Sequence, residues 1–508
     1  MLLSHMVDER AGQAPDHLAY RIDGTSISYS DLAMRSSQVA NWLMDLGIKK
    51  GDRVGIFMSK SLEIPITLSA IWKAGAAFVP IDPASPPQRV QSILNDCNIT
   101  LIFADRARRR VLQKLKGLRI IIGLEPGEID APITLSWDSA DSFSTTRPDL
   151  ALASSDLAYI MYTSGSTGAP KGLMHTHHSG MSYARLSGAL YEVQPTDRLT
   201  NHSPLHFDMS TFEYLTAPLH GASTIIVSEA TSMFPTALAE LIENEQVTFW
   251  YSVPLALTQM LLRGGLSERN IGSLRWVLYG GEPFPIKHLR RLMTLCPNAR
   301  FSNVYGPAEV NQCTYFHFDH PPKKDDQPIP IGQTWAETEH RIMDEREQPV
   351  TKGELWIHSS TMMQGYWNQP DLTAEKFRNL DGKCFYRTGD LIEEKDDLLW
   401  FMGRMDRQIK TRGYRVELDE VESAVLAHDA VDETAVISCP HPEDDTLKII
   451  AFVVLNRKDV DNAELKRAAS ERLPAYAVPE AWHVIAQFPK TGSGKVDRNA
   501  LLANLNGS

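Results

Sequence analysis

Short apolar runs alternate with amphipathic stretches through the first part of the chain. Residues 29–46 predict a helix, because Leu32, Val39, Leu43 and Leu46 fall near one face. A strand, a helix that tolerates Pro65 in its first turn, and a second strand follow over residues 52–58, 64–74 and 77–81. Such alternation predicts an α/β fold with parallel sheets.

The pattern changes near residue 400. Before it, buried strands are predicted over residues 157–162, 222–227, 247–250 and 398–402. A dense charged stretch then runs from Arg404 to Arg415. The remaining residues predict a small α+β unit, with helices over 417–427 and 463–473 and strands over 434–438 and 449–455. We expect a hinge near Gly403–Asp406, and a loop within one domain is the alternative.

Composition narrows the function classes. The chain has 508 residues, enough for roughly three units of about 150 residues each. Its net charge of −12 argues against a nucleic-acid or anionic-membrane partner, since both require a cationic face. The five cysteines form no C-x-x-C pair, which argues against a disulfide scaffold or zinc ribbon. With no signal-peptide or membrane-span pattern, we expect a cytoplasmic protein.

A loop rich in glycine and hydroxyl groups follows the strand predicted at 157–162. In Thr163–Gly172, glycines allow positive φ and bring backbone N–H groups close to an anion, and Lys171 adds charge. A Walker A loop would have glycine before its lysine and serine or threonine after it, whereas Pro170 and Gly172 stand there. The loop predicts a nucleotide phosphate site, with a plain surface loop as the alternative.

Together with other motifs, this loop resembles the adenylate-forming superfamily of acyl-CoA synthetases, luciferases and adenylation domains of nonribosomal peptide synthetases. The resemblance covers nearly the whole chain and is greatest to the amino-acid-activating branch, including stand-alone ligases such as prolyl-AMP ligases. The motifs that carry it are Lys73-Ala74-Gly75, Pro80-Ile81-Asp82-Pro83, Thr163–Gly172, Asn303–Glu309, Gly353-Glu354-Leu355, Tyr386–Asp390, Gly403–Asp406 and Thr491–Lys495.

The resemblance implies a domain plan. We expect a large N-terminal domain of stacked α/β subdomains over residues 1–403, which binds ATP and the amino acid. A hinge over 404–406, with Asp406 as its hinge residue, would join it to a small mobile α+β lid over 407–508. The lid would rotate between two half-reactions.

The resemblance also implies an ATP site with Mg²⁺. Asp390, expected at the end of a strand-like run, would accept both ribose hydroxyls. Arg404 would contact ribose or phosphate, Tyr305 would stack on adenine, and Glu309 would bind the magnesium. Each has an ordinary structural alternative: a turn aspartate, a surface arginine, a core tyrosine and a helix-capping glutamate. The full set of expected ATP-binding residues is Thr163, Ser164, Gly165, Ser166, Thr167, Gly168, Gly281, Asn303, Tyr305, Gly306, Asp390 and Arg404.

Two lysines are the expected catalytic cations. Lys495, in the Gly/Ser loop of the lid, would stabilise charge as the substrate carboxylate attacks the α-phosphorus, and Lys171 would act from the phosphate loop. One position departs from the family, which usually has threonine where this chain has Ala308. The hydroxyl toward the α-phosphate is therefore missing, and Thr163 or water would have to replace it.

The motif around Asp208 indicates the substrate class. In the family the matching aspartate pairs with the α-ammonium, and a plain acid would leave this carboxylate unpaired and buried. By the resemblance, the uncharged pocket walls would be Met209, Phe212, Ser252, Leu278, Gly280, Val304, Gln312 and Cys313, with Lys495 on the substrate carboxylate. Gln312 and Ser252 would bond a small polar group or each other. Proline is the first choice, and alanine, serine, 2-aminobutyrate or a β-amino acid are alternatives.

The second half-reaction needs a thiol partner. We expect the phosphopantetheine arm of a peptidyl or acyl carrier protein, supplied in trans, with Lys410–Gly413 facing the thiol tunnel; CoA is the alternative thiol. Two rival functions remain, an acyl-CoA synthetase for a small carboxylic or β-amino acid, and a non-catalytic nucleotide-binding relative. Three histidines, His175, His177 and His178, predict a polar helix start rather than a metal site.

Overall fold

Two mostly parallel sheets form the body of the protein in this computed structural model. The structure describes residues 1–130, 133–165, 170–324, 329–441, 446–457, 459–490 and 496–506. The first sheet has the order β16 (Gln333–Thr334), β15 (Thr314–Phe318), β14 (Arg300–Tyr305), β13 (Trp276–Gly280), β12 (Phe249–Ser252), β10 (Arg198–Asn201), β11 (Ser223–Ile226), β1 (Leu18–Ile22) and β2 (Thr25–Ser28). The second has the order β19 (Gly365–Tyr366), β9 (Lys171–Thr176), β8 (Leu157–Thr163), β4 (Ala77–Pro80), β3 (Arg53–Phe57), β5 (Leu101–Ala104), β6 (Ile120–Ile122) and β7 (Ile133–Leu135).

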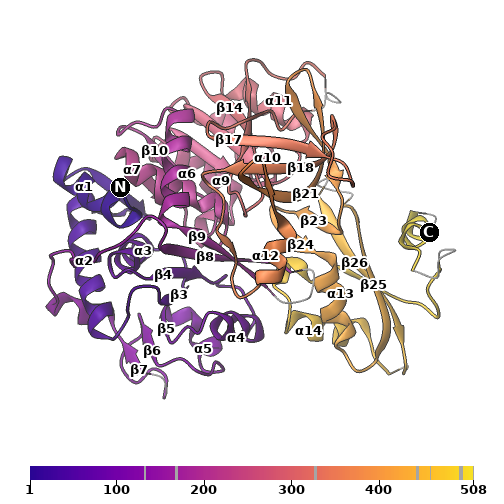
Figure 1. Cartoon of the computed structure of the whole chain (residues 1–508), viewed down its shortest axis with the longest axis horizontal. Coiled ribbons are helices and arrows are strands. Elements are labelled where there is room, and N and C mark those ends of the chain that lie inside the picture. The colour runs from indigo at the N-terminus through magenta and orange to yellow at the C-terminus, as the bar shows by residue number, and fades with distance from the viewer. Residues whose placement is uncertain are drawn as a thin grey trace.

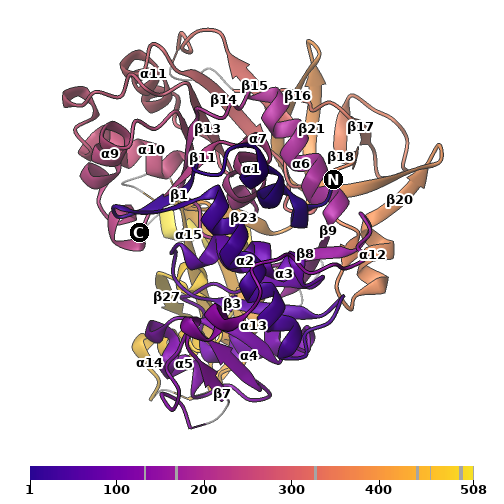
Figure 2. The ribbon, with the colours of Figure 1, turned by 90° about the vertical axis from the view of Figure 1, so that its left-hand side faces the viewer.

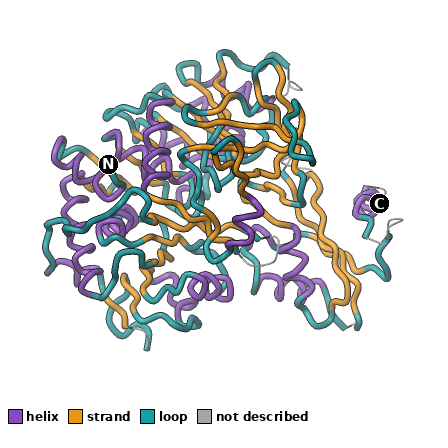
Figure 3. The backbone as a smooth tube through the Cα atoms, in the orientation of Figure 1, coloured by secondary structure: helices purple, strands orange, loops and turns teal. Residues whose placement is uncertain are grey.

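Helices lie between and around these sheets (Figures 1 and 3). In the body they are α1 (Met6–Gln13), α2 (Tyr29–Asp45), α3 (Glu63–Lys73), α4 (Pro87–Asp96), α5 (Arg109–Leu112), α6 (His177–Leu190), α7 (Ala217–His220), α8 (Glu229–Ser232), α9 (Pro235–Asn244), α10 (Pro254–Arg263), α11 (Ile286–Leu295) and α12 (Pro370–Lys376). No described helix is both long enough and apolar enough to cross a membrane.

An antiparallel sheet precedes the C-terminal unit. Its strands are β17 (Thr338–Met343), β18 (Lys352–Ser359), β21 (Lys383–Lys395), β20 (Phe377–Leu380) and β22 (Leu398–Arg404). The hairpin β23 (Gln408–Thr411) and β24 (Tyr414–Glu417) follows. The C-terminal unit, orange to yellow in Figure 1, contains α13 (Leu418–Leu426), β25 (Val431–Pro440), β26 (Leu447–Leu455), α14 (Asn462–Ser470), β27 (Ala481–Val484) and α15 (Arg498–Asn506).

The α/β fold class is confirmed, and the predicted helices and strands are all present with shifted ends. The strand predicted at 247–250 is displaced to Phe249–Ser252 as β12. Asp390 was expected at the end of a strand, and this is wrong. It lies inside the long β21, directly opposite Arg404 on β22. Antiparallel pairing with the neighbouring strand extends β21 past the Thr388-Gly389 step, which reads as a turn in the sequence.

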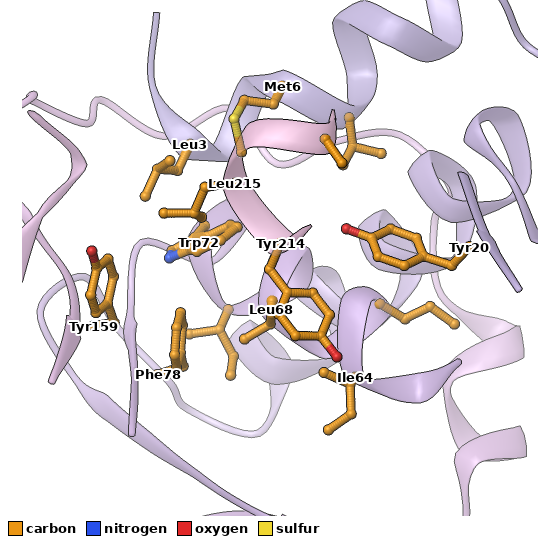
Figure 4. Packing of buried hydrophobic residues seen from close by; sticks show 14 of the residues in the cluster. Leu3, Met6, Tyr20, Ile64, Leu68, Trp72, Phe78, Tyr159, Tyr214 and Leu215 are labelled. Carbon is orange, nitrogen blue, oxygen red and sulfur yellow. The ribbon is translucent and has the colours of Figure 1, made fainter. Parts of the chain in front are cut away.

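Helix α3 is the centre of the body. Every residue from Ile64 to Lys73 is buried, as expected for a helix that is apolar on all sides. Trp72 packs among residues of both sheets and of the N-terminal segment (Figure 4), and its indole N–H donates to the Ala158 carbonyl at 3.0 Å. Figure 2 shows α2 in front of α3. This packing joins the two sheets into one rigid frame.

Lys73 ends this helix with a fully enclosed side chain. Its ammonium donates to Asp8 Oδ1 at 2.6 Å, to Ser36 Oγ at 2.9 Å, to Ser37 Oγ at 3.0 Å and to the Ala33 carbonyl at 3.0 Å. Burial lowers the pKa of Lys73, and Asp8 partly opposes this. The ion pair therefore ties α1, α2 and α3 together.

Replacing Lys73 by methionine should destabilise the protein by about 3 kcal/mol, because it leaves Asp8 without its buried partner. Urea unfolding followed by tryptophan fluorescence measures the change. Lys50→Met is the matched control, since Lys50 pairs with Asp156 at the surface and is about half exposed. Equal unfolding midpoints for the two variants would contradict the assigned role of Lys73.

Candidate functional site

A pocket opens where parallel strands of the first sheet end and the β23–β24 hairpin enters from the C-terminal unit. β13 ends at Gly280 and β14 at Tyr305, so the following residues Gly281 and Gly306 line the pocket. In parallel sheets the carboxyl ends of the strands are the usual place for ligands. From the hairpin, Gln408, Lys410, Gly413 and Arg415 line the opposite wall.

The predicted phosphate loop is the turn between β8 and β9. Thr163 and Lys171 stand opposite each other in this antiparallel pair, and Thr163 Oγ1 is buried with no hydrogen-bond partner among the described atoms. Ser164 Oγ donates to the Arg415 carbonyl at 3.0 Å, and the Gly165 backbone bonds to Glu420. Burial lowers the pKa of Lys171. The predicted Ser166, Thr167 and Gly168 lie outside the described residues.

The residues predicted for adenosine come together on the other side of the pocket. Tyr305 OH donates to Asp390 Oδ2, and Arg404 Nη1 donates to Asp390 Oδ1 at 2.6 Å. Arg404 also bonds Asp406 Oδ1 at 2.7 Å through its Nε. Both oxygens of Asp390 therefore have polar partners within the protein, and ribose hydroxyls would have to share or replace them.

Asn303 lies away from the pocket lining. Its Nδ2 donates to the Pro330 carbonyl at 2.9 Å, which turns the amide toward the neighbouring chain segment. Gly280 is also set back, and the adjacent strand crowds it, because a Cβ there would lie 2.4 Å from the Val304 carbonyl oxygen. Gly281 and Gly306 are thus the backbone positions that border the pocket.

Glu309, the predicted magnesium ligand, is 1% exposed and lies next to Ala308 and Arg415, which line the pocket. Its Oε1 accepts from Tyr366 OH at 3.0 Å and its Oε2 accepts from Arg415 Nη1 at 2.8 Å. Burial alone would raise the pKa of Glu309, but the Arg415 guanidinium outweighs burial and lowers it to about 2. The carboxylate is therefore ionised and already faces a cation.

The histidines are placed as the polar-helix interpretation expects, with one difference. His177 and His178 begin α6, where the Thr176 side chain accepts from Ser179 N in a capping box. His175 instead belongs to β9, where its Nε2 contacts the Ala308 carbonyl at 3.2 Å and its ring stacks on Tyr159. Within the described ranges, no three His, Cys, Asp or Glu side chains are arranged to hold a metal.

Asp208 lies in a short 3-10 turn that lines the pocket. Its Oδ1 accepts from the Met209 N–H at 3.0 Å, and no described cation lies within ion-pair distance. Burial raises the pKa of Asp208 to about 6, with Lys410 partly opposing the rise. The Asp208 carboxylate therefore has no ion-pair partner among the described residues, and a cationic ligand could supply one.

Of the predicted walls, Met209, Val304 and Gln312 line the pocket, together with Asp208. The suggested bond between Gln312 and Ser252 is not formed in the described structure. Gln312 Nε2 donates to Tyr251 OH at 2.6 Å, and Ser252 Oγ accepts from Trp250 Nε1 at 2.8 Å. The other predicted wall residues are buried behind the lining, namely Phe212, Ser252, Leu278 and Cys313.

The hairpin reaches far into the pocket. Gly413 N donates to Glu282 at 3.3 Å, and a Cβ at Gly413 would lie 2.5 Å from Val253 Cγ1, so only glycine fits at this approach. The Lys410 ammonium lies 5.8 Å from the centroid of the Tyr305 ring, within cation–π distance. Burial lowers the pKa of Lys410. The predicted Lys495 lies outside the described residues.

Sequence reasoning missed several residues in the pocket lining and behind it. Arg415 was noticed only as the end of a charged stretch, and Tyr366 lies far from Glu309 in sequence. Tyr251, next to the predicted Ser252, supplies the hydroxyl that fixes Gln312. Arg89 and Glu420 form a buried ion pair of 2.7 Å between the body and α13. None of these stands in a motif that suggests its partner.

Comparisons with known proteins agree with this geometry. The AMP-binding enzyme model matches residues 7–367, and the AMP-binding enzyme C-terminal domain model matches residues 420–495. The chain is 32% identical to an L-proline--[L-prolyl-carrier protein] ligase of Pseudomonas fluorescens, with 100% of both chains covered. It is 33% identical to tyrocidine synthase 3 of Brevibacillus parabrevis, over 99% of this chain but only 8% of that one.

A solved structure also superposes on most of the chain. It is NpsA-ThdA, an artificially fused adenylation-PCP di-domain from Klebsiella oxytoca, with a TM-score of 0.80 and 25% identity over 95% of this chain and 93% of that one. Its likeness agrees with a large N-terminal and a small C-terminal domain. On the family model and the full-length relative together, this chain belongs to the AMP-binding enzyme family.

Proposed function

We propose that this enzyme activates an amino acid with ATP as its aminoacyl-adenylate and passes it to the phosphopantetheine thiol of a carrier protein. The observation that carries the proposal is Asp208, a carboxylate in the pocket with no described cation within ion-pair distance. The α-ammonium of an amino acid supplies that cation. The full-length likeness to a ligase named for proline and a carrier protein supports proline as the first substrate.

In the first half-reaction, a substrate carboxylate oxygen attacks the α-phosphorus of ATP. The bond from that phosphorus to the bridging oxygen breaks, and pyrophosphate leaves with the electron pair. Asp208 would orient the substrate through its ammonium, Asp390 and Arg404 would hold the ribose, and Lys171 would meet the phosphates. Lys495 would stabilise the charge that develops between the carboxylate and the phosphate.

Glu309 fits a divalent-cation ligand, because it is buried, ionised and already pairs with a cation, the Arg415 guanidinium. One carboxylate with phosphate oxygens is a sufficient donor set for Mg²⁺. When bound, the ion neutralises phosphate charge. Thr163, whose buried hydroxyl has no hydrogen-bond partner among the described atoms, would donate to the phosphates in place of the hydroxyl that Ala308 lacks.

In the second half-reaction, the thiol loses its proton to solvent and its sulfur attacks the acyl carbon. The carbon–oxygen bond to the phosphate breaks and AMP leaves. The Lys410–Gly413 segment borders the route expected for the thiol arm. We place the catalytic core at residues 1–403, the hinge at 404–406 and the lid at 407–508, with Asp406 beside Arg404 at the hinge.

Proline should support ATP–pyrophosphate exchange better than other members of an amino-acid panel. Cyclopentanecarboxylate is the matched control, because it keeps the five-membered ring and the carboxylate but has no ammonium. We expect it to give no exchange above background. Equal exchange with both compounds would support the rival acyl-CoA synthetase function, and no exchange with any amino acid would refute the proposal.

The exchange reaction should depend on the ionisation of Asp208. Below its pKa of about 6 the carboxyl is neutral and cannot pair with an ammonium, so kcat/KM for the amino acid should fall as the pH drops through 6. Asp208→Asn should lower kcat/KM roughly 100-fold at pH 8, since it leaves the ammonium unpaired. The variant should show no step near pH 6. A step retained in Asp208→Asn would assign the titration to another group.

Lys495→Ala should lower exchange by on the order of 100-fold to 1000-fold, because the charge it supplies acts mainly in the transition state. ATP affinity, measured by calorimetry, should change little. Lys490→Ala is the matched control, as Lys490 lies in the same unit and pairs with Glu433 at the surface. Full exchange activity in Lys495→Ala would refute the catalytic role of Lys495.

A further inference from the structure

Arg415 contacts Glu309, the carboxylate expected to bind the metal ion. The two oxygens of Glu309 are taken by different partners, Tyr366 OH at 3.0 Å and Arg415 Nη1 at 2.8 Å. The glutamate side chain is 1% exposed and that of Arg415 is 20% exposed. Tyr366 belongs to the body, whereas Arg415 belongs to the hairpin that enters from the C-terminal unit.

The position of Arg415 is set by the inserted hairpin. Its carbonyl accepts from Ser164 Oγ at 3.0 Å, and Gly413 on the same hairpin donates to Glu282 at 3.3 Å. The Arg89–Glu420 pair fastens the helix that follows the hairpin to the body. Arg415 can therefore reach Glu309 only while the C-terminal unit has the arrangement seen here.

A divalent cation bound at Glu309 Oε2 would place a second positive charge beside the Arg415 guanidinium. A magnesium ion binds a carboxylate oxygen at about 2.1 Å, where its charge would repel a guanidinium on the same oxygen. The second oxygen, Oε1, already accepts from Tyr366 OH on the body side. When the metal leaves, Glu309 becomes a buried unpaired anion, which is costly unless a new cation arrives.

We propose that Arg415 competes with the divalent cation for Glu309 and so couples the hairpin to the metal. Departure of the cation with pyrophosphate uncovers Glu309, and the anion draws Arg415 and the hairpin into the pocket. The metal thereby holds the hairpin out during adenylate formation, and its loss permits the thiol-transfer arrangement. Arg415 is a positioning residue in this scheme. The inference rests on the proposed function, because it assumes a nucleotide site that uses a divalent cation.

The first test measures Mn²⁺ affinity in the presence of α,β-methylene-ATP, by the electron paramagnetic resonance signal of free Mn²⁺. Arg415→Gln removes the competitor and should tighten Mn²⁺ binding by about fivefold or more. Arg412→Gln is the matched control, since Arg412 is on the same hairpin and pairs with Glu480 in its own unit. Unchanged affinity in Arg415→Gln, or equal tightening in both variants, would overturn the proposal.

The second test uses the native sequence and reads the hairpin directly. Hydrogen exchange of residues 408–417, followed by mass spectrometry, should speed up when Mn²⁺ and α,β-methylene-ATP are added together, compared with the analogue alone. In Glu309→Gln the metal should make no difference. If Mn²⁺ does not change the hydrogen-exchange rate of residues 408–417 in the native protein, the coupling is refuted. Proline-dependent pyrophosphate exchange is measured on the same preparation. If pyrophosphate exchange is present but Mn²⁺ has no effect on hydrogen exchange, the coupling fails and the proposed function remains.

Discussion

The site depends on one electrostatic constraint: carboxylates held out of water must each find a positive partner. Asp390 has Arg404 at 2.6 Å, and Glu309 has Arg415 at 2.8 Å. Asp208 has only a backbone N–H at 3.0 Å. Asp390 and Glu309 thus have cationic partners within the protein, and Asp208 has none within ion-pair distance among the described residues. The Glu309–Arg415 pair also joins the hairpin to the body.

The fold supplies these groups from distant segments with little freedom. Parallel strands β13 and β14 end side by side, so the residues after Gly280 and Tyr305 meet at one edge. The antiparallel pair β21–β22 sets Asp390 opposite Arg404 in register. The all-buried helix α3 holds the two sheets together behind the site. A rigid body with one hairpin inserted is therefore the basic arrangement of the molecule.

The sequence predicted most helices, strands and motifs, but it did not predict which side chains contact one another across the fold. Periodicity found α2 and α3, because one-sided or continuous apolar patterns leave a local signal. It misplaced Asp390 at a strand end, since the length of β21 depends on pairing with β22. The sequence also did not predict that Arg415 pairs with Glu309, 106 positions away, or that Trp250 donates a hydrogen bond to Ser252. Such contacts arise from packing between segments, and no local pattern of residues encodes them.

The two acidic residues Glu309 and Asp208 show how far a partner decides the chemistry. Burial raises the pKa of both carboxyls, yet Glu309 falls to about 2 while Asp208 rises to about 6. The difference follows from a guanidinium at 2.8 Å beside one carboxylate and none beside the other. An ammonium brought by the substrate would do for Asp208 what Arg415 does for Glu309. Under the proposed function, discrimination against plain acids would be electrostatic and would hold only while Asp208 is ionised.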